Sequence, residues 1–286
     1  MEFISDVIQY EFLQKALFTS AMVGMICGVI GCFIVLRGLA LIGDAISHAV
    51  LPGVAISYML GINFFYGAVV AGVLTAMGIG FVSQNSRIKS DSAIGIVFTA
   101  VFAVGVILIS QVKTSTDLNS ILFGNVLSVR SSDMWMTLII GVIVLFTVTL
   151  FYKELLVSTF DPTMASAYGL PTKLLHYLLM VLLTMVTVAS LQTVGIILVV
   201  AMLITPASTA YLLTNRLSMM VVLSAIFGVL SAIIGLYFSF VYNFPSGAVI
   251  VLVTTVFFML ALFFSPKQGV LWRSLRTKRN KLVNNE

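Results

Sequence analysis

Long apolar runs separated by short polar segments dominate the sequence. Each run is long enough to cross a bilayer, which takes about 20 consecutive apolar residues in a helix. About nine such spans are predicted, at 12–36, 37–60, 64–82, 94–110, 135–152, 174–191, 194–213, 219–241 and 248–264. Since a helix satisfies its own backbone hydrogen bonds inside lipid, the pattern predicts an all-α polytopic membrane protein.

The composition agrees with this pattern. The chain has 286 residues, of which 60% are hydrophobic and only 9% are charged. A soluble domain carries about 25% charged residues, so most of this chain must have lipid or other helices as its surroundings. Cys27 and Cys32 lie on different faces of the first span and are interpreted as packing residues, not as a disulfide or a metal pair.

Basic residues predict the orientation. The formal net charge is +5, but six of the fifteen basic residues fall in the last twenty positions, which indicates a cytoplasmic end and not a nucleic-acid partner. Nine alternating spans then put twelve basic residues on the cytoplasmic side and three outside: Lys15, Lys113 and Arg130. The predicted organisation is an external segment at 1–11, a transmembrane domain at 12–264 and a basic cytoplasmic tail at 265–286.

Two polar connections interrupt the spans. Within the cytoplasmic segment at 153–173, the part from Thr163 to Gly169 is predicted as a short helix ended by glycine. The connection at 111–133 encloses a semi-apolar piece, 121–127, that is too short to cross a bilayer and is expected to form a surface or re-entrant helix.

Asp44 and His48 are ionisable residues inside an apolar stretch, 37–53, where such residues are unfavourable unless they have a structural or functional role. An Asp at the bilayer centre costs roughly 2.5–3.5 kcal/mol, so such groups usually face a bundle interior or a polar pathway. Four residues apart on a helix, the two side chains share a face, where a carboxylate oxygen and an imidazole nitrogen can meet one ion. This donor set suits manganese, iron or zinc, and a second copy of the chain would raise two ligands to four.

Other interpretations of this stretch stay open on the residues alone. Asp44 could cap a helix that starts there while His48 packs, or the pair could relay protons in a proton- or sodium-coupled transporter, or form the metal centre of an intramembrane enzyme. Pro52 and Pro206 are candidate gating kinks, and His176 is interpreted as structural or interfacial. The chain has no P-loop motif, so energy must come from a partner or an ion gradient.

The stretch from Gly43 to Gly53, GDAISHAVLPG, resembles the signature of the membrane permease subunits of ATP-binding-cassette importers for manganese, zinc and iron. Three later pieces agree: 122–127, 160–171, and 194–207 together with 244–248. The resemblance covers nearly the whole chain between about 12 and 264.

This resemblance implies a type II importer fold related to the vitamin B12 permease. It implies a homodimer in the bacterial cytoplasmic membrane, served by two cytoplasmic ATPase subunits and an external metal-binding lipoprotein. The chain itself would be a transport subunit and not an enzyme, with ATP bound by the ATPase partner. Asp44 and His48 would contact the transported cation. The helix that couples to the ATPase would be formed by Thr163, Met164, Ala165, Ser166, Ala167, Tyr168 and Gly169. Because the chain has only two histidines, manganese is favoured over zinc.

Overall fold

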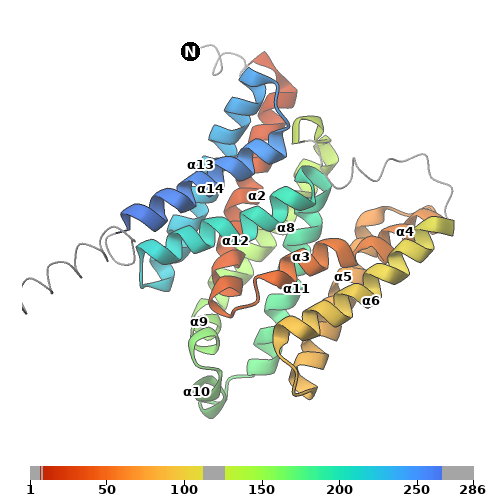
Figure 1. Ribbon diagram of the computed structural model, residues 1–286, viewed down its shortest axis with the longest axis vertical. Helices are drawn as coiled ribbons and strands as arrows, with labels where there is room; N and C mark the ends of the chain where they lie inside the picture. The colour runs from red at the N-terminus through yellow and green to blue at the C-terminus, as the bar shows by residue number, and fades with distance from the viewer. Residues whose placement is uncertain (1–6, 8, 112–125, 266–286) are drawn as a thin grey trace, which may run out of the picture.

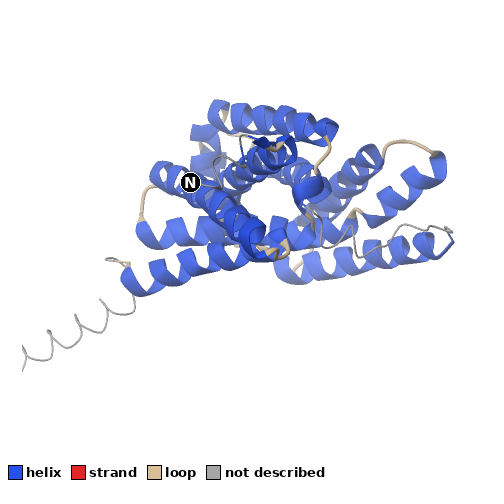
Figure 2. Cartoon of the chain, turned by 90° about the horizontal axis from the view of Figure 1, so that it is seen from above, coloured by secondary structure: helices blue, strands red, loops and turns tan. Residues whose placement is uncertain are grey.

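The computed structural model describes residues 7, 9–111 and 126–265 (Figure 1). Within these ranges the regular structure is entirely helical, as Figure 2 shows. The elements in chain order are α2 (Glu11–Leu36), α3 (Leu41–Ala49), α4 (Leu51–Leu60), α5 (Phe64–Asn85), α6 (Ser90–Gln111), η1 (Val126–Ser128), α8 (Ser131–Leu150), α9 (Tyr152–Phe160), α10 (Pro162–Ala167), α11 (Thr172–Val194), α12 (Ile196–Leu213), α13 (Leu217–Tyr242) and α14 (Ser246–Phe264).

Nine helical spans in the described part of the chain are long and apolar enough to cross a membrane. They range from 18 to 26 residues, and α3 and α4 together make the second one, Leu41–Leu60. The predicted number of spans and the all-α fold class are therefore confirmed, with boundaries that differ by a few residues.

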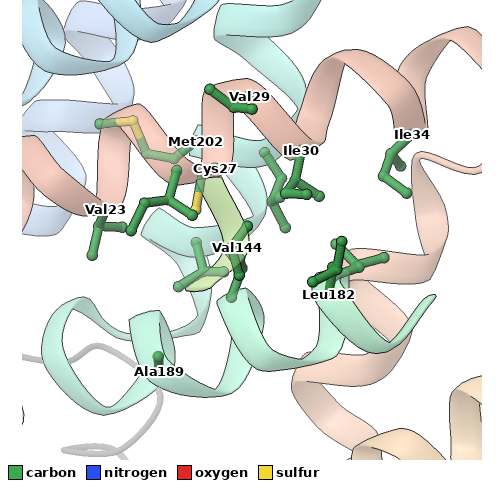
Figure 3. Close-up of a cluster of buried hydrophobic side chains, with 14 of the residues drawn as sticks. Val23, Cys27, Val29, Ile30, Ile34, Val144, Leu182, Ala189 and Met202 are labelled. Atoms are coloured by element: carbon green, nitrogen blue, oxygen red, sulfur yellow. The ribbon is translucent and has the colours of Figure 1, made fainter. Parts of the chain in front are cut away.

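Helix α2 lies at the centre of the molecule and is the most buried of the spans (Figure 1). Figure 3 shows its side chains meeting those of α8, α11 and α12, for example Cys27 near Val144 and Met202. Both Cys27 and Cys32 are free thiols buried in this core, as their interpretation as packing residues requires. A helix that is apolar on all sides is expected in such a central position.

The glycines of α2 allow α13 to approach its backbone directly. A Cβ added to Gly24 would lie 2.5 Å from the carbonyl oxygen of Gly228 on α13. One turn on, the Ser224 hydroxyl of α13 donates a 2.8 Å hydrogen bond to the carbonyl oxygen of Gly28. Close contact between small residues is the usual way for helices to associate in lipid, where apolar burial gives little driving force.

The remaining helices form two groups beside this centre. Helices α4, α5 and α6 pack together on one side, and α12, α13 and α14 pack together on the other (Figure 1). Helix α3 lies between them and contacts α5 and α6 on one side and α11 and α12 on the other. The helix that carries Asp44 and His48 therefore joins the two halves of the molecule.

The cytoplasmic segment predicted at 153–173 contains two helices. Sequence reasoning expected the short helix at 163–169, which the structure has as α10, but it did not predict α9 before it. Asp161 caps α10 by accepting a 2.8 Å hydrogen bond from the Met164 amide, and Gly169 follows with φ +79°, a conformation that favours glycine.

Some sequence predictions fall outside the described residues. They are the N-terminal segment at 1–11, apart from its last residues, the basic tail beyond Ser265, and the short helix at 121–127. Of that last piece the structure describes only Val126 and Leu127, which begin the 3-10 turn η1.

Candidate functional site

The turn between α2 and α3 sets the position of Asp44. Gly38 adopts φ +67° and reverses the chain, and α3 then begins at Leu41. Asp44 therefore lies within the first turn of the helix and not at its cap position, and the idea that it caps the helix start is wrong. The residue that precedes the helix, Ala40, has no side chain that could cap it.

Asp44 and His48 do share one face of α3. The Oδ1 atom of Asp44 lies 3.7 Å from Nε2 of His48, which is too long for a hydrogen bond. Two donors held about 2.1 Å from one ion lie about 3.0–3.4 Å apart, so a small rotation of either side chain would let both bind it. The side chains are 48% and 28% exposed, respectively, so both can be reached from outside the protomer.

Two phenylalanines of α6 surround the imidazole. The ring centroids of Phe98 and Phe102 lie 6.0 Å and 5.9 Å from that of His48, and the Phe102 ring meets it edge-on at 88°. The sequence analysis did not identify these residues. Their only signal is a pair of aromatic residues four positions apart, which does not reveal that α6 packs against α3.

The two predicted kinks differ in the structure. Pro52 lies in the first turn of α4, directly after the break at Val50 that separates α3 from α4. Because proline has no N–H, it cannot donate to the His48 carbonyl four residues earlier, which explains the break. Pro206 lies inside α12 without ending it. Helix α12 approaches the site through Leu203, whose Cδ1 would lie 2.9 Å from a Cβ added to Gly43.

One protomer supplies few metal ligands. Among the described residues no group of three or more His, Cys, Asp and Glu side chains could hold a metal ion. Asp44 and His48 lie close enough to be the pair of ligands that the sequence predicts, which stays a prediction, and His176 belongs to a different cluster.

That second cluster surrounds Arg37, which follows the last residue of α2. Its guanidinium donates to the hydroxyls of Ser158 at 2.8 Å and Thr159 at 3.1 Å on α9, and Nη1 lies 3.5 Å from Nδ1 of His176 on α11. Within the described residues no carboxylate forms an ion pair with Arg37. Burial lowers the pKa of Arg37, but an arginine side chain stays protonated in proteins.

The short helix α10 lies at one end of the molecule (Figure 1), and apolar side chains in and beside it are exposed. Tyr168, which follows it, is 73% exposed, and Met164 and Phe160 are also exposed, whereas Ala165 is buried against the protein. Exposed aromatic side chains at the two ends of a short capped helix are typical of a protein contact.

Comparisons with known proteins show the family and the fold of this chain. Residues 9–265 match the ABC 3 transport family. A curated relative, the manganese transport system membrane protein MntC of Listeria monocytogenes, is 67% identical over 96% of this chain and 99% of its own length.

Two solved structures share the fold. PsaBC from Streptococcus pneumoniae in complex with Fab contains a chain that is 50% identical, with a TM-score of 0.86, covering 97% of this chain and 99% of that one. An inward-facing putative metal-chelate type ABC transporter is 16% identical with a TM-score of 0.72, covering 91% of this chain and 88% of that one. This second likeness concerns the fold alone.

Proposed function

The chain belongs to the ABC 3 transport family, and we propose on this premise that it is the membrane permease subunit of a manganese importer. The observation that carries the proposal is the Asp44–His48 pair on α3, the helix between the two halves of the molecule. An oxygen and a nitrogen donor suit a divalent transition metal. The relative at 67% identity is named as a manganese transport protein, which favours manganese over zinc or iron.

Two ligands per protomer suit a cation that must leave the site again. A complete set of ligands would hold the ion too tightly for transport, because conduction needs binding that is weak enough to release. A second copy of the chain would supply another Asp44 and His48 and bring the site to four ligands. The partial exposure of both side chains supports this arrangement, since a site closed within one protomer would bury them.

The proposed complex contains two copies of this chain, two cytoplasmic ATPase subunits that bind ATP, and an external metal-binding lipoprotein. Helix α10, with the residues from Thr163 to Gly169, is the coupling segment that seats on the ATPase. Its exposed Met164 and Tyr168 supply the apolar contact. The proposal places segment 153–173 and the tail at 265–286 in the cytoplasm and segment 1–11 outside.

Transport then proceeds by alternating access. The loaded binding protein docks on the outer face, near 111–133 and 243–247, and closure of the ATPase pair moves the helices so that the ion passes Asp44 and His48. Pro52, at the break between α3 and α4, and Pro206, inside α12, are the positions at which these helices bend most easily.

A reconstituted complex tests this proposal. The permease, its ATPase and its binding protein are placed in liposomes, and ATP hydrolysis is measured with manganese, zinc or iron on the binding-protein side. Stimulation by manganese together with manganese uptake is the expected result. Uptake without ATPase subunits, driven by a proton or sodium gradient, would contradict the proposal and favour a secondary transporter.

A further inference from the structure

The side chain of Arg37 links the turn between α2 and α3 to two further helices, α9 and α11. It stands between α2 and α3, while its hydrogen-bond partners Ser158 and Thr159 lie on α9 and its neighbour His176 lies on α11. Helices α9 and α11 are the ones that flank α10 and contact it. One side chain thus joins both sides of the coupling segment to the turn that leads into α3.

The contacts of Arg37 are specific in their geometry. Its Nε and Nη2 atoms each bond a different hydroxyl, so two successive residues of α9 are held by one planar group. Ser158 is buried, and its hydroxyl also donates a 3.2 Å hydrogen bond to the Leu155 carbonyl. A movement of α9 along its axis therefore changes the position of the guanidinium.

Few residues separate Arg37 from the proposed metal ligands along the chain. The guanidinium belongs to the residue just before Gly38, whose positive φ makes the chain reversal, and α3 begins three residues later. Asp44 lies in the first turn of that helix. On the other side, Ser158 and Thr159 lie in the last turn of α9, and Asp161, two residues after Thr159, caps α10.

We propose that Arg37 is a positioning residue that transmits the movement of the coupling segment to the helix carrying Asp44 and His48. The inference rests on the proposed function and adds to it the residue through which ATP hydrolysis reaches the cation pathway. The hydroxyl partners fit this role, since hydrogen bonds to neutral groups can break and re-form more easily than a buried ion pair.

The test compares uptake per ATP hydrolysed in the full reconstituted complex. Arg37→Met keeps most of the side-chain volume but removes the donors, and the double variant Ser158→Ala/Thr159→Val removes both acceptors on α9. Both complexes are expected to assemble and to hydrolyse ATP, while manganese taken up per ATP falls about 10-fold or more, the scale of losing hydrogen bonds to a charged group. Arg87→Met, an exposed arginine in the loop between α5 and α6, is the matched control and is expected to leave this ratio unchanged.

Combining the changes separates coupling from general damage. If Arg37 acts through the two hydroxyls, the triple variant transports no worse than Arg37→Met alone, because the same interaction is lost only once. An unchanged uptake ratio in Arg37→Met, or losses that simply add in the triple variant, would overturn the inference. If the Arg37→Met complex does not assemble, the Ser158→Ala/Thr159→Val variant tests the inference instead. An unchanged amount of manganese taken up per ATP in that variant would overturn it. A wild-type complex that takes up no manganese would instead refute the proposed function, and this inference with it.

Discussion

The ring of Phe102 on α6 meets the imidazole of His48 on α3 almost at a right angle, with 5.9 Å between their centroids. Phe98 lies one turn away on α6 and contacts both rings. The imidazole is thus held between a carboxylate on its own helix and two aromatic rings on a neighbouring one. Its orientation depends on the packing of α3 against α6 as much as on the local sequence.

Replacing Phe98 or Phe102 by leucine is expected to loosen His48 and to raise the manganese concentration needed for half-maximal uptake. An aromatic pair contributes about 0.5–1.5 kcal/mol beyond its area, which corresponds to about a 2- to 10-fold effect. Uptake measured over a range of manganese concentrations gives the concentration for half-maximal uptake in each variant. Phe146→Leu on α8, which is exposed, is the control, and equal effects at all three positions would mean that the rings only fill space.

Asp44→Asn and His48→Gln each remove a proposed metal ligand while nearly keeping the size of the side chain. Loss of a residue that only orients a metal ligand costs about 10–100-fold in metal affinity or activity. Loss of a ligand itself is expected to reduce manganese uptake by more than this. Uptake of radioactive manganese and co-purification of the ATPase are measured together, so that a failure to assemble is recognised. Ser47→Ala, between the two ligands, removes only a hydrogen bond to the Gly43 carbonyl and serves as the control. Normal uptake by both ligand variants would exclude this pathway.

Gly24→Ala tests the close contact of α2 with α13. The added methyl group would overlap the Gly228 backbone, and overpacking of this kind costs about 1–3 kcal/mol. The thermal unfolding temperature of the detergent-solubilised protein is expected to fall. The same change at Gly95 on α6, where a Cβ meets nothing within 4 Å, should leave it unchanged. Equal shifts for the two variants would show that the Gly24 contact is not tight in the membrane protein.

Asp161→Ala removes the cap of α10 and is expected to destabilise this helix by about 0.5–2 kcal/mol. A less ordered coupling segment should bind the ATPase more weakly, which co-purification at increasing salt concentration would detect. Asp161→Asn keeps an acceptor for the Met164 amide and should restore binding. Weak binding by the Asn variant as well would show that the charge, and not the cap, matters to the partner.

The sequence predicts the spans well because each is a long apolar run, and it predicts α10 because a glycine follows it. Helix α9 was missed, since only nine residues with charges among them give no clear apolar run. The pairing of Asp44 with His48 follows from helical spacing alone. The features that the sequence could not predict depend on contacts between distant segments. Arg37 contacts Ser158, which lies 121 residues later in the chain, and no local sequence pattern indicates that contact.

The proposed division of ligands between two protomers has a genetic consequence. If each copy contributes only Asp44 and His48, a chain lacking both still assembles with a wild-type chain and leaves the mixed dimer with half its ligands. With equal expression and random pairing, about a quarter of the dimers would keep all four. Cells producing both chains should therefore show much less than half of normal manganese uptake, so that the defective allele behaves as dominant-negative.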